Sequence, residues 1–98
     1  MQIAPRGCPV CGFPDFEALD HDGYTTFEIC PSCGTESGYD YDAEVSDEHL
    51  MNLRRHWFFK KAGAWWSSHH AKPMGWDARD QLVQAQLAIP SADSQSSP

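Results

Sequence analysis

Four cysteines constrain this chain more than any other feature of its sequence. Cys8 and Cys11 lie in CPVCG, Cys30 and Cys33 lie in CPSCG, and eighteen residues separate the two pairs. Two residues between ligands let the chain turn so that both sulfurs face one ion at about 2.3 Å, and four sulfurs complete a tetrahedron. The spacing therefore predicts a structural Zn²⁺ site formed by all four cysteines.

The residues around each cysteine pair favour the tight turn called a zinc knuckle. Gly12 and Gly34 directly follow the second ligand of each pair, where a positive φ lets backbone N–H groups turn toward the sulfurs. Between the pairs, Asp22-Gly23 predicts a hairpin turn, and the β-prone run over 24–29 predicts its return strand. We therefore expect a zinc ribbon over 6–45, with its knuckles on β-hairpins.

The rest of the chain has helical patterns. Ser46 is suited to cap a helix over about 46–62 that Gly63 would end, and Asp77 is suited to cap a second one over 77–89. The polar tail over 91–98 is expected to be disordered. The predicted fold is a single small α+β domain over 1–90, in which the zinc ribbon packs against two C-terminal helices.

Iron is an alternative to zinc at this site. CPxCG turns around four cysteines, with aromatic and acidic neighbours, are also similar to rubredoxin, an electron carrier. All-sulfur tetrahedral sites accept either metal, so the spacing leaves an iron-tetrathiolate electron carrier open. A catalytic zinc instead keeps one position open, whereas four cysteines fill the coordination shell, so we do not expect an enzyme.

Charge is distributed unevenly between the two halves of the chain. The formal net charge is −7, and residues 1–48 hold one basic residue against eleven acidic ones. No apolar run approaches the ~20 residues that a bilayer requires, and the N-terminus has no secretory-signal pattern. We therefore expect a cytoplasmic protein, in a compartment where paired cysteines hold metal rather than form disulfides.

An acidic surface favours a basic protein as partner. Carboxylates and tyrosines alternate over 39–44, and adjacent tryptophans follow Gly63, one of which we expect to be exposed. The predicted partner-binding residues are Tyr39, Asp40, Tyr41, Asp42, Glu44, Trp65 and Trp66. A nucleic-acid-binding role stays open, because the stretch over 54–76 mixes basic and aromatic residues and contains no acid.

Several of these motifs together resemble a known family. CPVCG, EICPSCG followed by GYDYD, then GAWWS and KPMGWDARDQL, make the chain similar to the small CPxCG/CPCC-type zinc-ribbon proteins of bacteria. Ser32 stands where CPCC-type members have an extra cysteine. The resemblance implies a metal-bound, non-enzymatic protein, and similar domains are associated with toxin systems in which small acidic proteins act as immunity partners.

Overall fold

The first helix begins at the residue that the sequence predicts. In this computed structural model, which describes residues 3–91, Ser46 Oγ accepts the backbone N–H of His49 at 3.1 Å. Helix α1 (Asp47–Arg55) continues into a π-helical turn, η1 (His56–Lys60). Gly63, at φ 60°, donates its N–H to the Trp57 carbonyl and so closes the C-terminus. The helix expected over 46–62 is therefore present, with its last part wound as a π-helix.

The second helix is shorter than expected. Asp77 caps α2 (Ala78–Gln84) by accepting the Asp80 N–H at 3.0 Å, as predicted. The expected end at 89 is wrong, because Gln86 adopts a left-handed φ of 60° and Leu87 N–H bonds back to the Leu82 carbonyl. This closing turn sends Leu87 and Ile89 back onto the hydrophobic core.

No β-strand occurs among residues 3–91, so the predicted β-hairpins are not present as strands. Four isolated bridges stand in their place, among them an antiparallel Leu19–Thr25 bridge around the predicted Asp22-Gly23 turn. The return strand cannot run on to residue 29, because Phe27 has a φ of 59°, which interrupts extended backbone. Turns and loops therefore form the N-terminal half.

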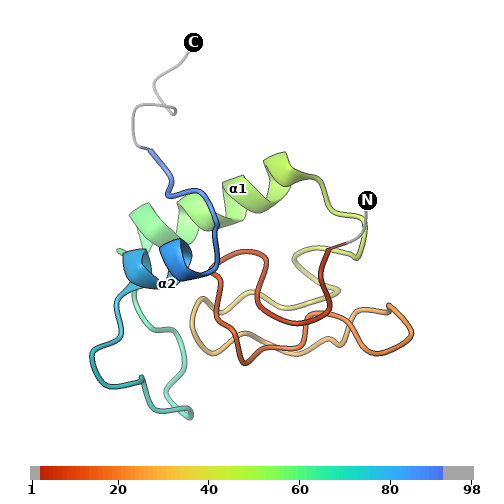
Figure 1. The fold of residues 1–98 in the computed structure, drawn as a ribbon, viewed down its shortest axis with the longest axis horizontal. Helices are drawn as coiled ribbons and strands as arrows, with labels where there is room; N and C mark the ends of the chain where they lie inside the picture. Colours follow the sequence, from red (N-terminus) through yellow and green to blue (C-terminus); the bar gives the residue numbers. More distant parts are fainter. Residues whose placement is uncertain (1–2, 92–98) are drawn as a thin grey trace.

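The helices lie to one side of the loops formed by the N-terminal half (Figure 1). The radius of gyration of 13.0 Å is that of a compact domain of this length. One core cluster joins the cysteine loops to both helices through residues such as Phe16, Leu50, Trp57 and Leu82. None of the helices in the described residues is both long and apolar enough to cross a membrane. Apart from Ser91, the tail expected to be disordered lies outside those residues.

Candidate metal centre

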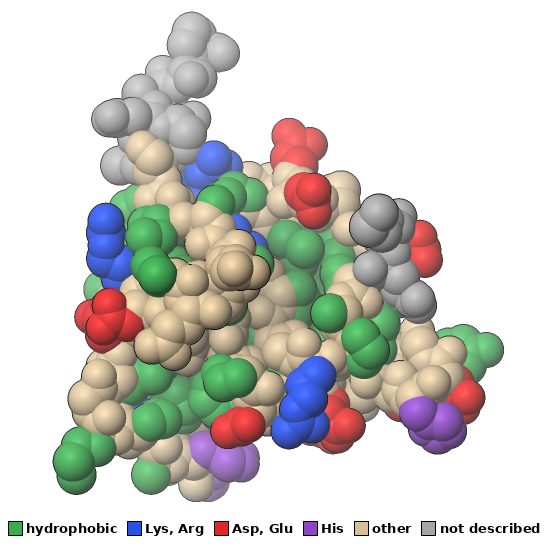
Figure 2. Space-filling model, in the orientation of Figure 1, with side chains coloured by type: hydrophobic (Ala, Val, Ile, Leu, Met, Phe, Trp, Pro, Cys, Tyr) green, Lys and Arg blue, Asp and Glu red, His purple; other side chains and the backbone are tan. Residues whose placement is uncertain are grey.

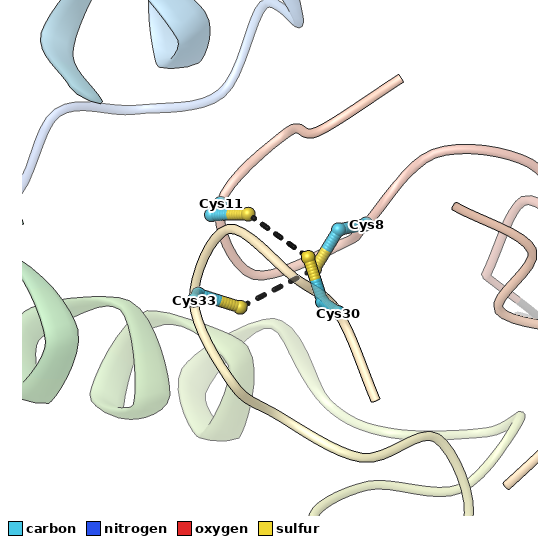
Figure 3. A group of neighbouring side chains, drawn as sticks. All are labelled: Cys8, Cys11, Cys30 and Cys33. Atoms are coloured by element: carbon cyan, nitrogen blue, oxygen red, sulfur yellow. Dashed lines mark hydrogen bonds between the residues drawn. The ribbon is translucent and has the colours of Figure 1, made fainter. Parts of the chain in front are cut away.

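The structure brings the four predicted ligands together. The sulfurs of Cys8, Cys11, Cys30 and Cys33 all lie within 4.8 Å of one another, and all four residues are buried. Figure 3 shows their side chains converging from two loops, one for each cysteine pair. Two segments that are far apart in the sequence therefore meet at a single group of sulfur atoms.

The two loops that contain the cysteines have the same hydrogen bonds. In the first, Gly12 N–H bonds to the Cys8 carbonyl at 2.9 Å and Cys8 N–H bonds to the Phe13 carbonyl at 2.9 Å. In the second, Gly34 N–H bonds to the Cys30 carbonyl at 2.8 Å and Cys30 N–H bonds to the Thr35 carbonyl at 2.9 Å. Both glycines have the predicted positive φ, at 86° and 82°. The two loops are therefore matching turns, each presenting two sulfurs on its inner side.

The spacing of the sulfurs fits one tetrahedral ion. A metal–sulfur distance of about 2.3 Å requires sulfurs roughly 3.8 Å apart. Cys8 Sγ lies 3.7 Å from Cys33 Sγ, and Cys11 Sγ lies 3.6 Å from Cys30 Sγ. A disulfide would need about 2.05 Å, and all four cysteines are free. The pocket therefore suits a metal ion, and four sulfurs suit zinc and iron equally.

Burial decides the charge that these sulfurs can hold on their own. It raises the pKa of the Cys11 and Cys33 thiols, because a buried thiolate loses its hydration. Burial also opposes ionisation of Cys8, but hydrogen bonds from the other three cysteines and from the Cys11 backbone lower the pKa of Cys8. The hydrogen bond to Cys11 lowers the pKa of Cys30, but hydrogen bonds to Cys33 and Cys8 together with burial raise it overall. The pocket alone therefore favours one thiolate, and four thiolates require a bound cation.

Three residues that the sequence analysis did not single out contact the two turns. Thr35 Oγ1 lies 3.0 Å from Cys33 Sγ, within reach of a hydroxyl–sulfur hydrogen bond. Gln81, on α2, donates from Nε2 to the Cys11 carbonyl and to Ser32 Oγ, each at 3.0 Å. Arg54, on α1, bonds the carbonyls of the two residues between Cys8 and Cys11. Apart from the threonine two positions after a ligand, sequence spacing contains no signal for these contacts.

Trp66 covers the second turn. Its N–H bonds to the Ser32 carbonyl at 3.0 Å, and Ser67 N–H bonds to the Pro31 carbonyl at 2.9 Å, so this segment pairs with the loop that carries Cys30 and Cys33. The indole lies so close to Gly34 that a Cβ there would be 2.4 Å from the ring. The Trp66 side chain still keeps 48% of its surface exposed. Trp66 is thus the exposed member of the tryptophan pair, while Trp65 is half-buried.

The structure corrects one predicted partner-binding residue. Tyr41 is only 4% exposed and belongs to the core, so its prediction as a surface contact is wrong. Burial raises the pKa of Tyr41, and the nearby cysteine charges raise it further. Tyr39 is 80% exposed, and Asp42 and Glu44 are exposed as well. Residues 38–40 form a turn and not an alternating strand, so Tyr41 lies in the core while Tyr39 stays exposed.

The basic stretch over 54–76 also differs from expectation. Arg54 is 5% exposed, so it cannot contribute to a surface for nucleic acid. Arg55 is half-buried and donates to Asn52 Oδ1 at 3.2 Å. Lys60, Lys61 and Lys72 are exposed. The alternative basic surface thus loses Arg54 and keeps a half-buried Arg55 and three exposed lysines.

The chain was also compared with known proteins. No protein-family model matches it, and neither the curated proteins nor the solved structures include a significant match.

Proposed function

We propose that this chain is a non-enzymatic, zinc-dependent protein-interaction module of the zinc-ribbon type. The observation that carries the metal assignment is the group of four buried sulfurs, presented by two turns with the same hydrogen bonds. A domain of this size buries a modest share of its surface, so metal binding adds a substantial part of the folding free energy. Zinc would be held by Cys8, Cys11, Cys30 and Cys33.

A structural task for the metal follows from the coordination. A catalytic zinc binds water or substrate at an open position, whereas four cysteine sulfurs leave none. The sulfurs also lie in the core, away from solvent. The bound ion would cross-link the two loops and thereby fix the surface that they form.

Metal content tests this assignment directly. Protein purified without added metal is expected to contain one zinc per chain and to be colourless. A red protein with iron in equal stoichiometry would instead support the rubredoxin-like alternative. Absence of any tightly bound metal under reducing conditions would reject both.

A cysteine variant tests whether the metal holds the fold. Cys33→Ser is expected to lose the zinc and the cooperative thermal transition, because binding energy here is folding energy. Met74→Ser, at a fully exposed side chain, serves as the control and should keep both. A Cys33→Ser protein that melts cooperatively at the wild-type temperature would contradict a structural metal.

The partner is proposed to be a basic protein that docks on the acidic N-terminal half. Residues 1–48 have a net charge of −10, from one base and eleven acids, and such a field attracts cationic surfaces. On the face shown in Figure 2, acidic side chains are dispersed among polar and apolar ones. Exposed Tyr39 lies among Asp40, Asp42 and Glu44 and supplies a rigid aromatic contact. Trp66 supplies a second such contact.

Charge-matched variants test this surface. The variant Asp40→Asn, Asp42→Asn, Glu44→Gln should lose capture of a basic partner from the cells that make the protein, while keeping its metal. A control with the same charge change, Asp15→Asn, Glu17→Gln, Asp22→Asn, should keep the partner, because these exposed acids lie elsewhere in the chain. Equal capture by both variants would contradict a specific acidic surface.

The nature of the captured partner separates the remaining functions. A single basic protein at equal stoichiometry would support an inhibitor, of which an immunity protein bound to a toxin is one form. Capture that disappears after nuclease treatment, with a steep salt dependence, would instead favour nucleic-acid binding.

A further inference from the structure

Arg54 places a positive charge inside the protein. Its guanidinium donates from Nε to the Val10 carbonyl at 2.6 Å, and its two terminal nitrogens donate to the Pro9 and Ala88 carbonyls at 3.0 and 3.2 Å. All three acceptors are neutral, and within residues 3–91 no carboxylate lies at ion-pair distance from it. Burial lowers the pKa of Arg54, but a guanidinium stays charged in proteins. A buried cation of this kind needs an anion nearby.

The anionic groups that raise the pKa of Arg54 are, in order, the sulfurs of Cys8 and Cys11 and the exposed carboxylate of Asp47. One peptide group, between Val10 and Cys11, accepts a hydrogen bond from Arg54 at its oxygen and donates its N–H to Cys8. The described peptide bonds are all trans, so the oxygen and the N–H of this group point in opposite directions. The guanidinium and the Cys8 sulfur therefore lie at the two ends of one peptide dipole, oriented so that each stabilises the other.

The charge of the loaded site supplies the reason for this arrangement. Four thiolates and one divalent ion carry a net charge of −2, and burying that charge is costly. A neighbouring guanidinium reduces the net charge of the buried group to −1. Gln81 contacts the adjacent peptide, at the Cys11 carbonyl, but it brings no charge.

We propose that Arg54 is the counter-cation of the four-cysteine metal centre, acting through the Val10–Cys11 peptide. This inference rests on the proposed metal binding and gives Arg54 an electrostatic role beyond holding the backbone. Arg54 is a positioning residue in this scheme, since it reaches the metal through the cysteine turn.

Iron provides a probe of charge at this site. A tetrathiolate site with ferric iron has a net charge of −1, and the same site with ferrous iron has −2, so a nearby cation favours the ferrous form and raises the reduction potential. We expect iron-loaded Arg54→Gln to prefer ferrous over ferric iron at least tenfold less than wild type does. For a one-electron couple this change lowers the reduction potential by ~59 mV or more. Zinc affinity, measured by chelator competition, should fall at least tenfold.

Three variants separate charge from packing. Arg54→Lys keeps the charge and is expected to stay close to the wild-type potential. Gln81→Leu removes neutral hydrogen bonds from the turns and should lower zinc affinity without moving the potential. Lys60→Gln removes an exposed charge and should change neither. A wild-type potential in Arg54→Gln, or a potential in Arg54→Lys as low as that of Arg54→Gln, would overturn the proposal.

If Arg54→Gln does not fold, the zinc affinities of Arg54→Lys and Gln81→Leu distinguish a charge role of Arg54 from a purely structural one. The charge role predicts that Arg54→Lys loses less affinity than Gln81→Leu. A backbone clamp alone predicts the reverse, because lysine cannot reproduce the three bonds of the guanidinium fork. If wild-type protein binds neither zinc nor iron, the metal centre itself is rejected, whereas metal binding that is independent of Arg54 rejects this inference alone.

Discussion

Gln81 donates a hydrogen bond to the Cys11 carbonyl at 3.0 Å, although the two residues are 70 positions apart in the sequence. The Gln81 side-chain nitrogen, Nε2, also donates to Ser32 Oγ, and the side-chain oxygen of Gln81 accepts the Trp76 indole N–H at 2.8 Å. One side chain on α2 therefore joins both cysteine turns to the tryptophan-rich segment. This contact connects the short helix α2 to the candidate metal centre.

Replacement of Gln81 should weaken the whole fold. Gln81→Leu leaves the Cys11 carbonyl, Ser32 Oγ and the Trp76 N–H without this partner, and we expect a loss of about 2–4 kcal/mol in the free energy of unfolding. Urea denaturation of the metal-loaded protein measures it. Gln84→Leu, at an exposed position of the same helix, should stay within about 0.5 kcal/mol of wild type. Equal stability of the two variants would show that the Gln81 contacts contribute nothing.

A methyl group at Gly34 should be costly for two reasons. Its φ of 82° disfavours any other residue by roughly 1–2 kcal/mol. The added Cβ would also meet the Trp66 ring, at 2.4 Å. Gly75→Ala is the matched control, because Gly75 has a φ of 72° and a Cβ added there would meet no other atom within 4 Å.

We expect Gly34→Ala to lose about 2–5 kcal/mol and Gly75→Ala about 1–2 kcal/mol in urea denaturation. Adding Trp66→Ala to Gly34→Ala should recover part of the difference, since the clash disappears. A Gly34→Ala protein as stable as Gly75→Ala would show that the indole moves away from the turn without penalty.

Removal of the Tyr41 hydroxyl should not harm the protein. This oxygen is buried and has no hydrogen-bond partner among residues 3–91, so Tyr41→Phe removes an unsatisfied polar group. We expect unchanged stability or a gain of up to about 1 kcal/mol, and unchanged partner capture. Thermal melting compares it with Tyr39→Phe at the exposed tyrosine, which should be neutral for stability. A loss above about 1 kcal/mol in Tyr41→Phe would indicate that the hydroxyl is bonded in the metal-loaded protein.

Metal affinity should increase as the pH rises. Burial and the neighbouring cysteine sulfurs raise the pKa of Cys11, Cys30 and Cys33, so all three are protonated near neutral pH without metal, and binding displaces those protons. Displacement of three protons implies an affinity gain of roughly 1,000-fold per pH unit below the thiol pKa. The stability that the metal confers is thus lost as the pH falls. Chelator competition between about pH 6 and pH 8 measures this slope, and a flat profile would mean that the thiols are already ionised.

Local patterns account for what the sequence predicted correctly. The pairing of two cysteines in each turn, the positive φ of Gly12 and Gly34, the caps Ser46 and Asp77 and the stop at Gly63 depend on residues only a few positions apart. Such signals survive in any tertiary context, because the turn or cap is formed by its own neighbours. Residues 24–29 had a strand-like pattern, but the left-handed Phe27, whose ring lies over Gly38, overrides it.

Long-range packing decided the rest. Arg54 belongs to a basic stretch of the sequence that gives no sign that this residue is buried. It is buried because the first cysteine turn, 44 positions away, packs against it and the Val10 carbonyl accepts its Nε–H. Tyr39 and Tyr41 belong to the same acidic motif, and the core determines which one is exposed. The sequence alone therefore determined the cysteine pairs that are the candidate ligands and the turns that hold them, because short-range geometry dictates both. Only the tertiary structure decided which charges and aromatic rings surround them, because burial depends on segments that meet after folding.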